Sequence, residues 1–252
     1  MRGGIAFRLY KINPDAVGFL NDLFNQTNNI SIHYETYRSK KSIKLFFEIK
    51  NTEKNDYGRT INLYLDRIQF MPTKDDANKP VKITPVYQMQ ILENKSNFQN
   101  HLLIFGNKGI DYSIKNAFEK HIESVSSSVP IPLTLIKPDF RKLKELIKEF
   151  PNLQQFCIKD VGDDQIDDII LKGTKLEKNT NFARYAIDKD TKGDVNFVGL
   201  SNNNKIIYVG RDGSFYSREQ FSKTNIPELI YNFLNRLDKI DVLNYSTLDK
   251  HV

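Results

Sequence analysis

A short pattern of glycine, tyrosine and serine occurs twice in this chain of 252 residues. The pattern G-x-x-G-x-x-Y-S begins at Gly106 and again at Gly210, each time after an apolar run and before a helical pattern. A second pattern, I-x-P-D, begins at Ile12 and at Ile136. Because both patterns recur in the same order and context, we interpret the chain as two copies of one unit. The alternative is that two strand-exit turns arose independently, since both are rich in turn residues.

The two copies are predicted to span residues 1–126 and 127–252. In the first copy, apolar residues at helical spacing predict helices near each end, over 14–24 and 114–122. Alternation of apolar and polar residues predicts the strands between and around them, and leaves open whether the last two form a hairpin. These strands are 5–12, 30–37, 42–50, 60–71, 86–92 and 101–105.

The second copy repeats this order. Two helices are predicted to bury one apolar stripe each, Leu143, Leu146, Ile147 and Phe150 in one, and Ile230, Phe233, Leu234 and Leu237 in the other. The strands before and between these helices are expected from a series of apolar runs, at 133–136, 153–161, 166–171, 182–187, 195–200 and 206–209.

Short polar turns between strands favour antiparallel neighbours, and helices at the ends of each copy can cover one face of a sheet. The expected fold class is therefore α+β. Two such sheets joined edge to edge would form a pseudo-symmetric curved sheet, with helices on one face and the other face open. In its order of elements this layout resembles the saddle of the TATA-box-binding protein family. None of that family's motifs is present, so no functional residue is carried over.

Composition limits the classes of function. The net charge is +6, and the basic surplus lies mainly in residues 1–126. Such an excess permits nucleic-acid binding without establishing it. The single cysteine, Cys157, excludes a disulfide framework and a cysteine-based zinc site. With no signal-peptide pattern and no apolar segment near 18 residues, we expect a cytoplasmic protein with no membrane partner.

The strongest functional hypothesis is a non-enzymatic nucleic-acid-binding protein. Aromatic side chains among cations on an open sheet face can stack on bases while the cations contact phosphates. The backbone N–H groups of the two glycine turns could also cradle a phosphate ahead of a helix. The predicted contacts are Arg8, Tyr10, Lys44, Phe46, Lys50 and Tyr64 on the open face, with Lys108 and Arg211 in the glycine turns.

Two other functions are weighed against this one. The same sheet face, or a sheet edge, could pair with another protein or a second copy, which would make the chain a structural or assembly subunit. Glu48 and Lys50 also match the E-x-K half of a metal-dependent nuclease signature, although the Asp residues that precede them lie on a predicted helix.

No catalytic, metal or cofactor site is predicted. The acidic stretch 160–168 lacks calcium-loop spacing and fits a solvated turn. The four histidines are scattered, and the motifs of nucleophile elbows and zinc proteases are absent.

Overall fold

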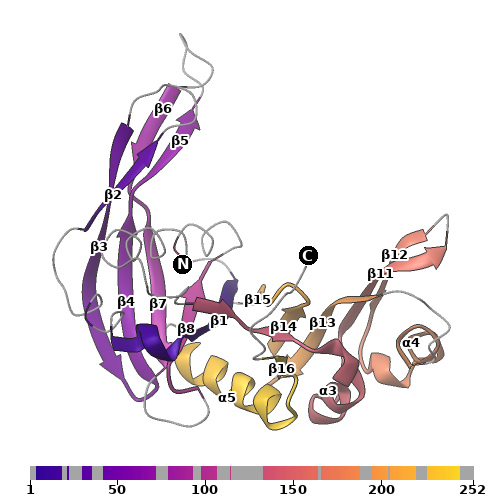
Figure 1. The fold of residues 1–252 in the computed structure, drawn as a ribbon. Helices are drawn as coiled ribbons and strands as arrows, with labels where there is room; N and C mark the ends of the chain where they lie inside the picture. Colours follow the sequence, from indigo (N-terminus) through magenta and orange to yellow (C-terminus); the bar gives the residue numbers. More distant parts are fainter. Residues whose placement is uncertain are drawn as a thin grey trace. The chain divides into compact units, whose positions relative to one another are not determined.

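The computed structural model describes residues 4–18, 22, 30–35, 42–71, 79–92, 98–106, 114, 133–163, 166–187, 194–203, 205–219 and 226–244. Its contacts divide the chain into two compact units (Figure 1). The composite unit joins Met1–Leu9 to Leu135–Val252, and the continuous unit is Tyr10–Thr134. The fold is α+β, with a sheet content well above the helix content.

This division differs from the predicted boundary between residues 126 and 127. The first strand belongs to the composite unit as far as Leu9, because it pairs with a strand far along the chain, with Phe7 opposite Phe215. The internal duplication stays a prediction.

Six antiparallel strands form the sheet of the composite unit, in the order β12-β11-β13-β14-β15-β1 (Figure 1). Asn203 adopts a left-handed backbone (φ 49°) in the tight turn between β13 and β14, and asparagine tolerates this conformation better than most residues. The strands are β1 (Ile5–Ile12), β11 (Gln155–Asp163), β12 (Ile166–Lys172), β13 (Asp194–Asn202), β14 (Lys205–Gly210) and β15 (Ser214–Ser217).

The described helices of this unit pack on one face of the sheet, which we call the inner face. Phe233 lies 6.3 Å from Phe215 of β15, and Phe182 lies 4.9 Å from Phe156 of β11, both measured between ring centroids. The helices are η2 (Phe140–Lys142), α3 (Leu143–Glu149), η3 (Leu176–Lys178), α4 (Thr180–Phe182), η4 (Ala183–Ile187) and α5 (Ile226–Lys239). The short strands are β9 (Leu133–Leu135), β10 (Lys137–Pro138) and β16 (Leu243–Asn244).

Both predicted helix stripes are buried, except that Ile147 is partly exposed. The run from Phe182 to Ile187, expected as a strand, is instead helical. Asn179 explains the helix start, because its side chain caps α4 by accepting a hydrogen bond from the backbone N–H of Asn181 at 2.8 Å.

A chain of four buried phenylalanines joins the sheet to its helices. Phe7 and Phe215 stack at 5.0 Å, Phe215 meets Phe233 of α5 edge-on, and Phe233 lies 5.3 Å from Phe150 at the end of α3. All four rings are at most 1% exposed. Each aromatic side chain buries a large apolar area, about 150–250 Å², so these rings contribute strongly to the core of the unit.

Arg236 closes this core at the surface. Its guanidinium lies 4.0 Å from the ring centroid of Phe150 and donates hydrogen bonds to the carboxylate of Glu149 (2.8 Å) and the side chain of Asn202 (3.0 Å). It also donates to the backbone carbonyl of Glu149, at the end of α3. A cation there satisfies a carbonyl that the helix leaves unpaired.

Five antiparallel strands form the sheet of the continuous unit, in the order β8-β7-β4-β3-β2. The sequence left open whether the last two strands of the first copy form a hairpin. They do, because β7 pairs antiparallel with β8. A separate hairpin is formed by β5 and β6. It is anchored by the buried carboxylate of Asp66, which pairs with the ammonium of Lys82 at 2.6 Å and accepts a hydrogen bond from the hydroxyl of Thr84 at 2.7 Å. The elements are η1 (Pro14–Ala16), β2 (Ile30–Glu35), β3 (Ser42–Asn55), β4 (Gly58–Leu65), β5 (Arg67–Met71), β6 (Lys79–Ile83), β7 (Val86–Leu92) and β8 (His101–Phe105).

None of the helices in the described part of the chain is both long and apolar enough to cross a membrane.

Both I-x-P-D patterns lead from a strand into a 3₁₀ helix, but they use different capping residues. In the first pattern Asn13 accepts a hydrogen bond from the backbone N–H of Asp15 at 3.1 Å, and Pro14 is the first helical residue. In the second pattern Pro138 belongs to β10, and Asp139 caps η2. The two prolines therefore occupy different positions relative to the cap.

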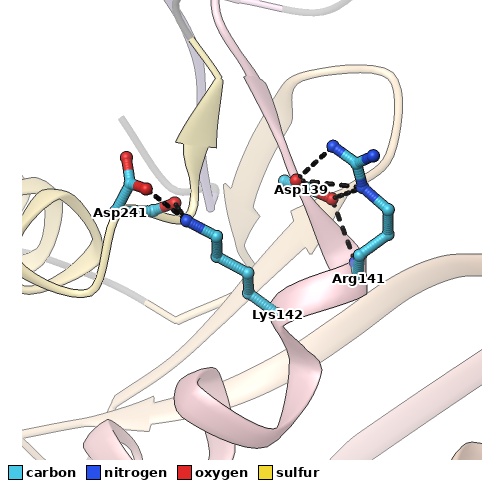
Figure 2. A network of polar contacts seen from close by, with 4 residues as sticks. All are labelled: Asp139, Arg141, Lys142 and Asp241. Carbon is cyan, nitrogen blue, oxygen red and sulfur yellow. Dashed lines mark hydrogen bonds and ion pairs between the residues drawn. The ribbon is translucent and has the colours of Figure 1, made fainter.

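Asp139 belongs to a polar network that holds η2 against the end of α5 (Figure 2). Its carboxylate accepts hydrogen bonds from the backbone N–H (3.0 Å) and the guanidinium (2.7 Å) of Arg141. Its own N–H donates to the carbonyl of Val242 at 2.7 Å. Lys142 donates to the carbonyl of Asp241 at 2.8 Å and pairs with its carboxylate. The hydrogen bonds from Arg141 hold the pKa of the Asp139 carboxyl below its ordinary value of 3.8.

Truncating Phe233 to alanine is expected to lower the free energy of unfolding by about 3–5 kcal/mol, because it removes the ring between Phe215 and Phe150. Chemical denaturation followed by circular dichroism measures this loss. Asn232→Ala, on the exposed side of α5, is the matched control and should change stability by less than about 0.5 kcal/mol. A loss below about 1 kcal/mol for Phe233→Ala would contradict the packing described.

Asp139→Ala is expected to cost about 1 kcal/mol at neutral pH, because it removes a helix cap. The folded-state pKa is lowered, so this contribution is complete above the unfolded value near 3.8 and is lost as the pH falls through the folded value. Stability curves of the wild type and the variant should therefore converge in acid. Asp139→Asn retains a capping oxygen and is the control. Equal destabilisation at every pH would contradict this assignment.

Candidate nucleic-acid interface

Three aromatic rings lie in a row across the outer face of the composite sheet, the face opposite the described helices. Tyr208 of β14 and Tyr216 of β15 are direct cross-strand partners, and their rings stack at 4.5 Å with an interplanar angle of 10°. Phe197 of β13 meets Tyr208 edge-on at 6.3 Å. All three side chains are partly exposed. The row is therefore a partly solvent-accessible aromatic surface on a rigid sheet.

Strand alternation fixes the direction of these rings. Val209 and Phe215 are fully buried on the inner face, so their neighbours Tyr208 and Tyr216 point to the outer face. Gly199, opposite Tyr208 on β13, leaves room for the ring. A Cβ atom at Gly199 would lie only 3.0 Å from Cε1 of Tyr208. The glycine thus allows the tyrosine to lie close over the neighbouring strand.

Arg218 lies beside this row, directly after β15, and is exposed. Burial raises the pKa of the Tyr216 phenol and Tyr208 raises it further, while the charge of Arg218 and a hydrogen bond from it act in the opposite direction. The phenol of Tyr216 is therefore neutral at physiological pH. The row offers ring faces, a neutral hydroxyl and a cation, which suit stacking and hydrogen bonding better than nucleophilic chemistry.

Several other cations of the composite unit are paired with aspartates. Lys159 lies 3.9 Å from Asp168, and Arg211 pairs with Asp194, with all four side chains at least 41% exposed. Exposed pairs of this kind contribute little to stability and exchange partners readily. A phosphate can therefore compete with the aspartates for these cations.

Arg8 and Tyr10 do not lie on an open face, which corrects the expectation from alternation. Arg8 is 5% exposed and forms an ion pair with Asp212 at 2.7 Å, and Tyr10 is 2% exposed. The physical reason is that β1 is buried from Phe7 to Tyr10, on both of its faces. Arginine is tolerated there because Asp212 neutralises its charge.

The other predicted face residues belong to the continuous unit. Tyr64 is partly exposed and lies opposite Glu48, which is also partly exposed. In the backbone register, Lys44 is opposite His33, Phe46 is opposite Ser31, and Lys50 is opposite Asn62. The side chains of Lys44, Phe46 and Lys50 lie outside the described part of the structure, so their roles stay predictions.

The glycine turn at Gly210 leads into β15 and not into a helix, which removes the expected helical phosphate cradle. Gly213 adopts a left-handed backbone (φ 79°), and its N–H donates to the carbonyl of Gly210 at 3.0 Å. Asp212 accepts a hydrogen bond from the N–H of Ser214 at 3.1 Å, so the turn is closed by its own side chain. Arg211 is exposed on this turn, whereas Lys108 of the first turn is outside the described residues.

The described residues provide no metal-binding cluster of the kind that a metal-dependent nuclease requires. Within those ranges, no group of three or more His, Cys, Asp or Glu side chains is placed to hold a metal ion. In the acidic stretch 160–168, Asp167 and Asp168 on β12 are exposed. Most of the other side chains in this stretch lie outside the described part of the structure.

The row formed by Phe197, Tyr208 and Tyr216 is not among the contacts predicted from the sequence. Tyr208 lies within an apolar run, and Tyr216 lies within the repeated glycine pattern. The signal was available in the alternation of Tyr208 with Ile207 and Val209, and of Tyr216 with Phe215 and Ser217.

No family model, curated protein or solved structure matches this chain.

Tyr216 is expected to ionise at a higher pH than an ordinary tyrosine. Because its folded-state pKa is raised, the neutral phenol stabilises the fold below the unfolded pKa near 10, and this contribution is lost as the pH rises through the folded value. A titration of tyrosinate absorbance should therefore lose a component above the ordinary tyrosine range in Tyr216→Phe. Tyr185→Phe, in η4, should retain this component. A high-pH component of unchanged amplitude in Tyr216→Phe would contradict the assignment.

Proposed function

We propose that this protein binds single-stranded nucleic acid on the outer face of the composite sheet and is not an enzyme. The observation that supports this most directly is the stacked pair of Tyr208 and Tyr216 beside exposed Arg218. Stacking of a base on an aromatic side chain contributes about 1–3 kcal/mol and tolerates any base sequence. A nearby cation adds contact with phosphate.

A single strand suits this surface better than a duplex. Bases in a duplex are stacked on one another, so their faces are not accessible to rings fixed on a flat sheet, whereas unpaired bases can be splayed onto such rings. The edge-on ring of Phe197 extends the row beyond Tyr208. In the continuous unit, taken by itself, Lys44, Phe46, Lys50 and Tyr64, together with Lys108, remain proposed contacts with nucleic acid.

We also propose a cytoplasmic location. Cys157 is 1% exposed, and burial raises the pKa of its thiol, so it is a poor nucleophile and a poor partner for an intermolecular disulfide. A lone inert thiol fits a reducing compartment. The internal duplication remains part of the proposal, supported by the strand-to-helix position of both I-x-P-D patterns.

Assembly with another protein is the second candidate function. It is favoured by the pairing of Arg8 with Asp212 and of Arg211 with Asp194, because paired cations attract phosphate less strongly. Ile170, which is 51% exposed at the end of the same sheet, also suits a protein contact.

Fluorescence anisotropy with labelled single-stranded DNA, single-stranded RNA and a duplex, each at two salt concentrations, tests the proposal. Tyr208→Ala and Tyr216→Ala are expected to weaken single-strand binding by about 1–3 kcal/mol without changing the salt dependence. Arg218→Ala should lower the slope of log K against log salt by about one. Tyr185→Ala, a partly exposed tyrosine in η4, is the matched control and should have no effect.

Three results would overturn the proposal: no binding at low salt, stronger binding to the duplex, or single-strand binding that survives both tyrosine substitutions. In the last case, Lys44→Ala and Tyr64→Ala would test whether the contact lies in the continuous unit.

A further inference from the structure

The outermost strand of the composite sheet, β12, has an edge without a partner among the described residues. It pairs with β11 on one side and ends the strand order on the other. From Asp167 to Lys172 every residue is exposed or partly exposed, and Ile170 is one of two large apolar side chains in the described chain that are more than half exposed. Open edges offer unpaired backbone N–H and C=O groups to another strand.

We propose that β12 pairs antiparallel with β12 of a second copy of this chain. A two-fold axis that continues a sheet across two identical antiparallel strands runs perpendicular to the sheet, so each outer-face residue meets an outer-face residue. Two residues that are opposite each other must then both have even numbers or both have odd numbers. The two-fold axis consequently lies midway between the two copies of one residue, which is opposite itself.

Placing the axis at Ile170 gives complementary partners at each of the positions 168–172. Ile170 lies opposite its own copy, Ile169 lies opposite Leu171, and Asp168 lies opposite Lys172. The last pairing occurs twice, once on each side of the axis. Directly opposite residues of opposite charge stabilise an antiparallel pair, and the exposed isoleucines are removed from water.

The register within the chain agrees with this arrangement. Ile170 is opposite Cys157, Asp168 is opposite Lys159, and Lys172 is opposite Gln155 in the pairing of β12 with β11. Cys157 shares the outer face of the sheet with Phe197, its partner on β13. Asp168, Ile170 and Lys172 are therefore all on the outer face, as the axis requires. Asp168 would lie between Lys159 of its own chain and Lys172 of the second copy.

This inference is independent of the proposed nucleic-acid function, because it concerns the free protein. The test is sedimentation velocity over a range of concentrations on nuclease-treated full-length protein. A strand pair of this length is a small interface, so we expect a reversible monomer–dimer equilibrium that shifts with concentration.

Three sets of variants distinguish this register from other contacts. Ile170→Lys should abolish the dimer by placing two cations at the axis, whereas Val86→Lys, at the comparably exposed Val86 of the continuous unit, should leave it intact. Asp168→Lys alone and Lys172→Asp alone should each be monomeric, because like charges then face each other at both flanking positions. An equimolar mixture of these two variants, or one chain carrying both, should dimerise again.

Recovery in the mixture also shows that each single variant is folded. A monomeric wild type at all concentrations, a dimer that persists in both Ile170→Lys and Lys172→Asp, or a mixture that stays monomeric would each overturn the proposal.

Discussion

The burial of Phe215 is the constraint on which the composite unit depends. Its ring lies between Phe7 of the neighbouring strand and Phe233 of α5, so one face of β15 must be the core face. Side chains in a strand alternate, and a slip of one residue would send Phe215 into water and Tyr216 into the core. The same contact that holds the helix to the sheet therefore also presents Tyr216 to solvent beside Tyr208.

The charges of this unit follow from the same geometry. Arg8 is next to Phe7 on β1 and must point to the opposite face, where it is nevertheless buried. A buried guanidinium needs a carboxylate, and Asp212 supplies one from the turn that precedes β15. The glycines of that turn let the chain reverse tightly enough to bring Asp212 to Arg8 and to the N–H of Ser214. The glycine turn at Gly210, expected to cradle a phosphate, therefore helps to neutralise a buried arginine.

The sequence was sufficient for features set by local periodicity and insufficient for features set by long-range pairing. The helix stripes around Leu146 and Phe233 and most strands were predicted correctly, since 3.6- and 2-residue periods are visible in a short window. The pairing of Phe7 with Phe215 joins residues about two hundred positions apart, and no local pattern indicates it. For that reason the unit boundary and the burial of Arg8 and Tyr10 could not be anticipated. The aromatic row was missed for a related reason, because Phe197, Tyr208 and Tyr216 become neighbours only through the register of three strands.

The aromatic row and the free edge of β12 belong to the same sheet, and this connects the two proposals. A two-fold axis perpendicular to the sheet leaves both outer faces on the same side of the dimer. Each copy would then present its own row of Phe197, Tyr208 and Tyr216 on one continuous surface, with the axis at Ile170 between the two rows. A strand bound to one row would hold its remaining bases near the second row, so the second contact would be effectively intramolecular. Two weak stacking surfaces could in this way give tight binding on a face where exposed Arg211 is paired with Asp194. Because the two rows run in opposite directions about the axis, such a dimer would favour a ligand that loops back or is long enough to turn between them.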